Sequence, residues 1–378
     1  MIYMDHGATS FPKPYPVCRA VKEALHSCAN PGRGGYWAAR NADRTVFECR
    51  EEAAALFGCE PEQVVFTGNC THGLNIAIGT VVKPGMKVAV SGFEHNAVLR
   101  PLYALGAETV VCGRKLFDPE DTLGDFRAAL GAGAQAVVCT HVSNVFGYVL
   151  PLEAIGALCR ERKVPLIVDA AQSAGVLPLS LKNLGASFIA MPGHKGLLGP
   201  QGTGLLLCGE KGRPLLFGGT GTASREKTMP EELPERLEPG TLNVPGIAGL
   251  REGLRYVRQQ GPENLLCREH GALEEAAEIL KAQDFTVFRG PHQAGTLSFL
   301  PDGDCQVFAD FLSGRGIGVR AGLHCAPLAH ESAGTLDTGT VRLSFGWNTE
   351  RRHLSALRHA IGVLKSAGRQ GRIYPAGE

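Results

Sequence analysis

The chain has 378 residues, which at about 150 residues per domain suggests two or three domains. Apolar residues make up 44% and charged residues 20%, so the chain can build a large core and does not have the composition of a disordered protein. Lys and Arg (38) balance Asp and Glu (37), which argues against general binding to nucleic acids or anionic membranes.

The 12 cysteines include no C-x-x-C pair, and no Cys/His cluster has zinc-ligand spacing, which argues against a structural metal site. Asp5 and His6 interrupt the start of the chain, so we expect no signal peptide, a cytoplasmic location and reduced thiols. No run approaches the ~18 uninterrupted apolar residues of a membrane span.

Between about residues 60 and 210, short apolar runs alternate with helical patterns. The runs that we expect to be strands cover 63–67, 87–91, 108–112, 134–140, 165–169, 186–191 and 203–208. Helical patterns between them include 96–104, 121–131 and 152–162. Strands that are apolar throughout are typical of a parallel sheet buried on both faces. This half predicts an α/β, doubly wound, mostly parallel sheet, with its last two strands in a hairpin or an antiparallel edge pair.

A polar, Gly/Pro-rich stretch over 218–246 is expected to form a long surface loop, and such loops are more often functional than idle. A second, α+β unit follows a helix over 247–260. Its expected helices cover 263–283, 305–314 and 349–367, and its expected strands lie near 285–288, 295–299, 318–320 and 340–344. We therefore expect a large domain over 16–250 and a small domain over 251–378, with residues 1–15 packing nearby and a frayed tail over 368–378.

The segments LIVDAAQSAGV and FIAMPGHKGLLGPQG carry the strongest chemical signal. Asp169 ends an apolar strand, where α/β sheets place ligands, and Lys195 follows at the end of the next strand. This pair suits pyridoxal phosphate (PLP), because a Lys amine forms the Schiff base and a carboxylate stabilises the protonated pyridine nitrogen. Either residue alone also fits a structural role, and their pairing favours the cofactor site.

Further polar residues follow other strand ends. Thr71-His72-Gly73 is expected to open a helix whose free N–H groups bind a phosphate, unless Thr71 is a plain N-cap. His95 can stack on an aromatic ring or serve as a capping or core His. Asn144 and Gln172 lie where they can hydrogen-bond a cofactor or a substrate.

The second unit contains a cysteine and an arginine in unusual settings. Cys325 lies in a Gly/Pro-flanked loop beside His324 and downstream of Arg320, where positive charge would lower the thiol pKa and favour the thiolate; a structural Cys is the alternative. Arg342, inside the apolar run TVRLSF, needs a partner, either a substrate carboxylate held by two hydrogen bonds or a structural salt bridge.

Taken in order, these segments resemble one family, the class V aminotransferase-type PLP enzymes, and within it the group II cysteine desulfurase and selenocysteine lyase branch. The resemblance runs from YMDHGATSFPKP to VRLSFGWNT; its most specific segments are EHNAVLRPL, VSNVFGYVLPL, VDAAQSAGV, GHKGLLGPQGTG, EPGTLNVPGIAGL and RAGLHCAP. It implies fold type I, with a large α/β domain and a small C-terminal domain, and a homodimer with two sites near the interface.

The resemblance also implies how the cofactor is held. Lys195 would be the Schiff-base lysine, Asp169 would bind the pyridine nitrogen, and His95 would stack on the ring. Gln172 and Asn144 would contact the ring oxygen or the substrate. Four residues would hold the phosphate: Thr71, His72, His194 and, from the other subunit, Thr241.

For the reaction, the resemblance implies that Arg342, assisted by Arg320, binds the substrate carboxylate. Cys325 would take the sulfur of L-cysteine as a persulfide and leave alanine, so that Lys195, His95 and Cys325 would be the catalytic residues. L-selenocysteine is a further expected substrate, and a sulfur-acceptor protein an expected partner.

Three positions depart from the family pattern. The usual Asn-Ala-Ala-Thr is His6-Gly7-Ala8-Thr9, the Ser expected before GHK is Pro192, and the paired His before the catalytic Cys is Leu323-His324. These changes bear on the substrate and the sulfur step more than on the cofactor. The alternatives are another class V PLP enzyme, namely a C–S β-lyase, transaminase or epimerase, or a non-catalytic sulfur carrier.

Overall fold

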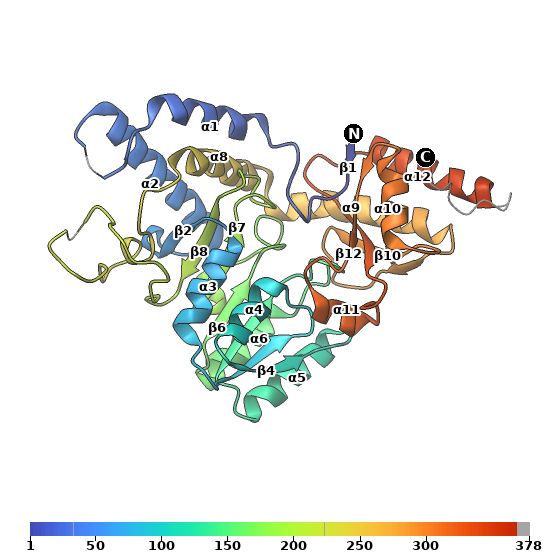
Figure 1. Cartoon of the computed structure of the whole chain (residues 1–378), viewed down its shortest axis with the longest axis horizontal. Coiled ribbons are helices and arrows are strands. Elements are labelled where there is room, and N and C mark those ends of the chain that lie inside the picture. Colours follow the sequence, from blue (N-terminus) through green and yellow to red (C-terminus); the bar gives the residue numbers. More distant parts are fainter. Residues whose placement is uncertain (33, 223, 369–378) are drawn as a thin grey trace.

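The computed structural model describes residues 1–32, 34–222 and 224–368. A seven-stranded sheet forms the centre of its larger part (Figure 1). In spatial order the strands are β2 (Val64–Thr67), β8 (Gly204–Cys208), β7 (Phe188–Pro192), β6 (Leu166–Asp169), β5 (Ala136–Thr140), β3 (Lys87–Ser91) and β4 (Glu108–Cys112). Strands β3 to β7 run parallel, whereas β8 is antiparallel to both β7 and β2. The predicted mostly parallel sheet and the antiparallel pairing of its last two strands are confirmed, but the pair is not at the edge, because β2 pairs with the outer side of β8.

Helices cover both faces of this sheet. They are α1 (Tyr15–Ser27), α2 (Trp37–Phe57), α3 (Cys70–Val81), α4 (Asn96–Ala104), α5 (Pro119–Gly131), α6 (Leu152–Arg162), α7 (Leu181–Leu184) and α8 (Val244–Gln260), with 3-10 turns at Pro61–Gln63 and Glu235–Leu237. Side chains of β5 alternate between the faces, as strand geometry requires. Val137 and Cys139 join a core with α2, α5 and α6, whereas Ala136 and Val138 join a core with α3 and α4. Burial on both faces explains why the strands are apolar throughout.

The second part is built on a four-stranded antiparallel sheet. Its strands, in spatial order, are β12 (Arg320–Gly322), β13 (Thr340–Ser344), β10 (Thr296–Leu300) and β9 (Thr286–Phe288). Its helices are α9 (Pro262–Lys281), α10 (Cys305–Ser313), α11 (Pro327–Ala333) and α12 (Arg351–Gly368). At the other end of the chain, β1 (Ile2–Tyr3) pairs with β11 (Ile317–Gly318), so the N-terminal segment packs on this part.

The structure differs from the sequence prediction in a few elements. Helices α1 and α2 were not predicted, and the strand expected near 318–320 is two short strands, β11 and β12. Helix α8 begins earlier than expected because Asn243 caps it, accepting a hydrogen bond from the N–H of Gly246 (3.1 Å). The expected domain boundary near residue 250 falls inside α8, whose Leu250 and Leu254 belong to the core of the larger part.

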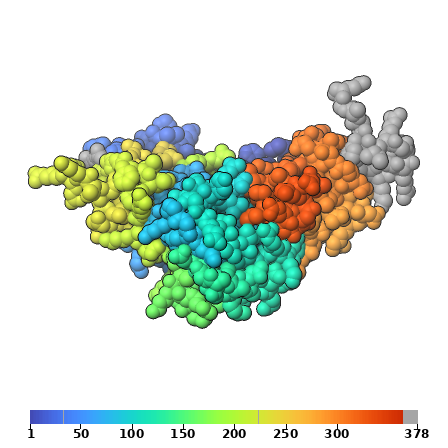
Figure 2. Space-filling view, turned by 60° about the horizontal axis from the view of Figure 1, so that its bottom comes forward, coloured from blue at the N-terminus to red at the C-terminus, as the bar shows by residue number. Residues whose placement is uncertain are grey.

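The stretch between β8 and α8 is the long surface excursion expected from the sequence, and it projects at the left end of the molecule (yellow in Figure 2). Near its end, Glu238 accepts hydrogen bonds from Arg50 Nη1 (2.9 Å) and from the N–H of Phe66 (2.5 Å). The predicted frayed tail, apart from Gly368, lies outside the described residues. Within the part of the chain that the structure describes, no helix is both long enough and apolar enough to cross a membrane.

Candidate active site

Polar side chains converge where β6 and β7 end. Asp169 is the last residue of β6, and Lys195 follows three residues after β7, on the neighbouring parallel strand. Together they line a cavity of about 120 Å³, which we call the active-site cavity. Its walls include eight of the residues singled out from the sequence: Thr71, His95, Asn144, Asp169, Gln172, Pro192, His194 and Lys195.

Asp169 is held by two donors that bind the same oxygen. Its side chain is buried, and its Oδ1 accepts hydrogen bonds from the N–H of Ala171 (2.9 Å) and from Cys70 Sγ (3.5 Å). Oδ2 makes no hydrogen bond to a described residue and stays available to a ligand. Burial lowers the pKa of Lys195 and the charge of Arg342 lowers it further, while Asp169 opposes both effects. The lysine is therefore shifted toward its neutral, nucleophilic form.

Helix α3 begins one residue earlier than predicted, because Asn69 rather than Thr71 is its N-cap. The side chain of Asn69 accepts a hydrogen bond from the N–H of His72 (2.9 Å), so that N–H is not free. The N–H groups of Cys70 and Thr71 have no acceptor among the described residues. These two donors, at the positive end of the α3 dipole, can bind an anionic group.

His95 caps helix α4 with its side chain. Its Nδ1 accepts a hydrogen bond from the N–H of Ala97 (3.0 Å), and burial lowers the pKa of the imidazole. A ring that accepts at Nδ1 and is neutral carries its proton on Nε2. His95 is therefore a helix cap, and because it also lines the cavity, stacking on an aromatic ring stays open to it.

Cys325 lies in a loop tied to the large part by two hydrogen bonds, one of them from Asn144, which lines the active-site cavity. Its carbonyl accepts from the N–H of Asn96 (2.8 Å), and the carbonyl of His324 accepts from Asn144 Nδ2 (2.8 Å). His324 and Cys325 both have positive φ, 49° and 58°, a conformation that costs energy for residues other than Gly. The Cys325 side chain is exposed.

The expected positive charge of His324 is absent. Burial lowers the pKa of its imidazole to about 2, so the side chain is neutral at neutral pH. That part of the prediction is wrong, because the sequence did not show that this residue packs inward against Thr340. Arg320, which is exposed and pairs in register with Arg342, is left as the nearby cation.

Arg342 forms a structural salt bridge, one of the two interactions that the sequence left open for it. Its side chain is 2% exposed, with Nη2 2.6 Å from Asp5 Oδ1 and Nη1 2.9 Å from the carbonyl of Asn144. Its buried Nε and the Oδ1 of Asn144 have no hydrogen-bond partner among the described residues. Buried unpaired polar atoms indicate a place for a polar ligand.

The other expected residues are less directly placed. Burial lowers the pKa of His194 to about 4, so its imidazole is neutral at neutral pH and offers a phosphate no positive charge. Its Nδ1 lies 3.1 Å from Thr9 Oγ1. His72 does not line the active-site cavity, and its Nδ1 accepts from the N–H of Gly68 (3.3 Å). Thr241 is exposed and lines a different pocket, beside Arg50 and Glu238.

Sequence reasoning missed Cys70 and Asp5. Cys70 directly precedes the predicted Thr71 at a strand end, so its position was a usable signal. The partnership of Asp5 with Arg342 joins residues at opposite ends of the chain, and no local pattern indicates it.

Residues 2–357 match the aminotransferase class-V family. The chain belongs to this family. A probable cysteine desulfurase of Methanothermobacter thermautotrophicus is 33% identical, with 97% of this chain and 95% of the relative covered. The cysteine desulfurase of Haloferax volcanii is 28% identical over 97% of this chain and 89% of its own length. The apo structure of cysteine desulfurase from Thermococcus onnurineus superposes with a TM-score of 0.88 at 31% identity, covering 97% of this chain and 95% of that chain.

Proposed function

We propose that this chain is a PLP-dependent cysteine desulfurase that converts L-cysteine to L-alanine and carries the sulfur as a persulfide on Cys325. One observation carries the proposal. An exposed cysteine lies in a loop whose backbone is held by Asn96 and Asn144, and Asn144 also lines the cavity that contains Lys195 and Asp169. An exposed thiol on a loop anchored to the cavity of a buried lysine and carboxylate fits the activity named for its relatives.

The residues of the active-site cavity fit PLP. Lys195 would attach it, the free Oδ2 of Asp169 would bind the ring nitrogen, and His95 would lie against the ring. The unpaired N–H groups of Cys70 and Thr71, with Thr71 Oγ1, would receive the phosphate. Pro192, in place of a Ser, offers no hydroxyl there, so we assign the phosphate mainly to the start of α3.

When bound, PLP supplies an electron-withdrawing ring that makes the Cα–H of an amino acid acidic. The lowered pKa of Lys195 shifts it toward the neutral amine, which can hold that proton. The unpaired Nε of Arg342 and Oδ1 of Asn144 are the groups that we assign to the substrate carboxylate and its neighbours. Asp5 uses one of the two N–H groups of Nη2, which leaves the other for a second hydrogen bond from Arg342 to the substrate.

The sulfur step is a transfer between two thiols. The Cys325 thiolate attacks the substrate sulfur, an S–S bond forms, and the substrate Cβ–S bond breaks with its electron pair leaving on carbon. A proton then completes the methyl group of alanine. One thiol and one cysteine thus give one persulfide and one alanine. The exposure of Cys325 leaves its outer sulfur open to an acceptor protein, which we propose as the partner.

The test is a pair of product assays on purified protein with L-cysteine and a thiol reductant. We expect stoichiometric PLP absorbance, equal alanine and sulfide from the wild type, and a loss of about 100-fold in alanine formation in Cys325→Ala. The matched control is Cys267→Ala, which removes another exposed thiol and should keep full activity. Alanine formation that does not depend on Cys325 would contradict the proposal.

A second candidate is a C–S β-lyase or transaminase with the same lysine site. Leu323, 41% exposed where the resemblance expects an imidazole, favours it, because one acid–base group is missing beside the thiol. Pyruvate or a keto acid in place of alanine would support this candidate. L-selenocysteine in the same assay tests the second expected substrate, and the cytoplasmic location stays a proposal.

A further inference from the structure

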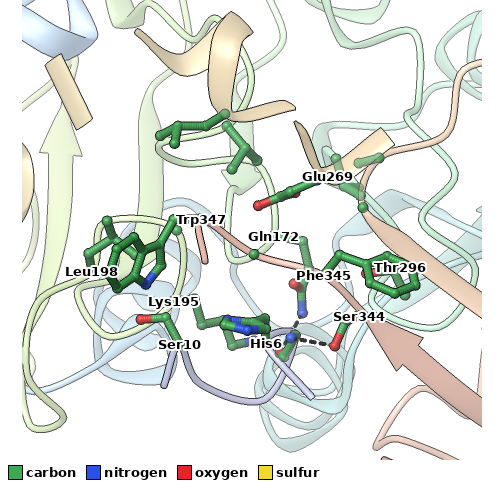
Figure 3. A pocket seen from close by; sticks show the side chains of 18 residues that line it. His6, Ser10, Gln172, Lys195, Leu198, Glu269, Thr296, Ser344, Phe345 and Trp347 are labelled. Carbon is green, nitrogen blue, oxygen red and sulfur yellow. Dashed lines mark hydrogen bonds between the residues drawn. The ribbon is translucent and has the colours of Figure 1, made fainter. Parts of the chain in front are cut away.

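A second cavity adjoins the active-site cavity. It has a volume of about 40 Å³ and shares Lys195 and Gln172 with the first. Its walls come from loops of the large part, from the N-terminal segment, from helix α9 and from the small sheet, so it lies at the junction of the two parts of the molecule (Figure 3). We call it the junction cavity.

Glu269 of α9 is the unexplained group of this cavity. Its side chain is 91% buried, with a residual exposure of 9%, and its carboxyl end is turned toward the middle of the cavity (Figure 3). It makes no hydrogen bond or ion pair with any described residue. A Cβ at Gly295 would come within 2.4 Å of its Oε2, so the glycine leaves the room that this carboxyl occupies.

An unpaired buried carboxylate is costly and must be neutralised by a proton or a cation. The protein does not provide the cation: Lys195 and His6 share the cavity, but neither forms an ion pair with Glu269. Burial lowers the pKa of His6 to about 4 and also lowers the pKa of Lys195, so both are shifted toward their neutral forms. The cavity therefore presents one carboxyl group that no described cationic side chain pairs with.

We propose that the junction cavity binds a small monovalent cation, either an alkali-metal ion or ammonium, with Glu269 as its charged ligand. A single carboxylate balances a charge of one, whereas a divalent ion would leave an uncompensated positive charge in the buried cavity.

Neutral groups complete the lining. The hydroxyl of Thr296 makes no hydrogen bond to a described residue. Gln172 donates its side-chain N–H to the carbonyl of Gly7 (3.0 Å), so its side-chain oxygen is left to bind a cation. The indole of Trp347 adds an aromatic wall, which attracts cations when its face is presented. A volume of about 40 Å³ accommodates an ion with one or two waters.

Occupancy would couple the two parts of the chain. Glu269 belongs to the part that holds Arg342, whereas Gln172 and Lys195 belong to the large sheet. Burial raises the pKa of Glu269 to about 8, so without an ion it keeps its proton at neutral pH and the ion displaces that proton. The ion thus stabilises the junction beside the active-site lysine without being part of the reaction.

The test measures the thermal midpoint of the holoenzyme in chloride salts at constant ionic strength. Potassium, sodium and ammonium are compared with tetramethylammonium, whose methyl groups keep its charge away from a carboxylate. We expect at least one small cation to raise the midpoint of the wild type saturably, by about 4 °C at a hundredfold excess over its Kd. Comparing ammonium with the metal ions separates the two sources. Thallium(I), detected by its anomalous scattering in crystals, should lie beside Glu269.

Glu269→Gln is the deciding variant, because the amide has the shape of the protonated carboxyl and the variant should fold. Its midpoint in tetramethylammonium and its PLP absorbance check that it does. The response to small cations should disappear in Glu269→Gln and persist in Glu278→Gln, an exposed carboxylate of the same helix. A wild type that responds equally to all four cations, or a response that survives in Glu269→Gln, would overturn the proposal.

Discussion

Cys70 and Ala171 donate to the same oxygen of Asp169, which gives the carboxylate a fixed orientation. A carboxylate with both donors on Oδ1 directs Oδ2 to the cavity, where the ring nitrogen of PLP would lie. Cys70 is thus a positioning residue rather than a redox group, and burial together with Asp169 raises the pKa of its thiol.

We expect Cys70→Ala to weaken PLP binding about threefold to fivefold, because a hydrogen bond of this kind contributes about 1 kcal/mol. Cys70→Ser keeps a donor and should stay within about twofold of the wild type. Fluorescence titration of the apoenzyme with PLP measures both values. Cys208→Ala, which removes a buried thiol on β8 outside the active-site cavity, is the control. Equal affinities in Cys70→Ala and the wild type would contradict a positioning role.

Glu94 predicts a pH dependence of stability. It is fully buried, and burial raises its pKa from 4.5 to about 8, although Ser91 Oγ and the N–H of Thr140 bind its Oε1. Between these two values the unfolded chain has lost the proton that the folded chain keeps. The stability that Glu94 contributes is therefore complete below about pH 4.5 and is lost as the pH rises toward 8.

Glu94→Gln removes this titration. Relative to the variant, the wild type should lose on the order of 4 kcal/mol of unfolding free energy over that range. Chemical denaturation of both proteins at pH 5, 7 and 9 measures the difference. A difference that is constant with pH would show that Glu94 is ionised in the folded protein already at pH 5.

At the scale of elements, the loop between β12 and α11 depends on contacts from the large part. Asn144 Nδ2 holds the carbonyl of His324, and the N–H of Asn96 holds that of Cys325. Two successive residues at positive φ need such support, because their backbone conformation is unfavourable by itself. The position of the thiol is therefore set by the large part as much as by its own loop.

Asn144→Ala should speed hydrogen exchange of the amides at 323–326 about fivefold, because one hydrogen bond of about 1 kcal/mol is lost. Mass spectrometry of the relevant peptide measures the rate in the protein without substrate. Asn243→Ala, which removes the N-cap of α8, is the control and should leave that peptide unchanged. If exchange there is the same in Asn144→Ala and the wild type, the loop is held without this side chain.

Local pattern predicts those elements whose residues all share one environment. β3 and β13 have the predicted bounds because nearly all of their residues are buried, on both faces of each strand. The start of α3 was misplaced because Thr and Asn are both good N-caps, and only the backbone geometry chooses between them. The strand ends located Lys195 and Asp169, since parallel strands present their carboxyl ends at one edge.

At the scale of the whole molecule, the N-terminal segment joins both parts. It pairs with β11, places Asp5 against Arg342, and reaches the loop of Lys195 through Thr9 and Ser10, which both bind the carbonyl of His194. These contacts lie up to 337 positions apart in the chain, so no sequence periodicity predicts them. For this reason the sequence could not show that Arg342 pairs with Asp5, and it left a salt bridge and a substrate carboxylate as equal alternatives.

The exposed apolar residues predict the oligomeric state. Leu215, Leu216 and Phe217 are 46%, 56% and 74% exposed in the excursion between β8 and α8, and Tyr36 and Trp37 are 57% and 64% exposed at the start of α2. Both segments lie at the same end of the molecule (Figure 1). Such a patch, close in the chain to Thr241, fits an interface at which this threonine enters a second subunit's site.

We expect a solution mass of about 80 kDa by light scattering, twice the 40.1 kDa of one chain. Phe217→Glu combined with Leu216→Glu places two charges in the apolar patch and should give monomers that also retain PLP more weakly, because Thr241 no longer reaches a partner. Tyr103→Glu, at an 88% exposed position on α4, is the matched control and should stay dimeric. A wild type of 40 kDa with full PLP occupancy would show that one chain completes its own site and that Thr241 has no role in a partner's.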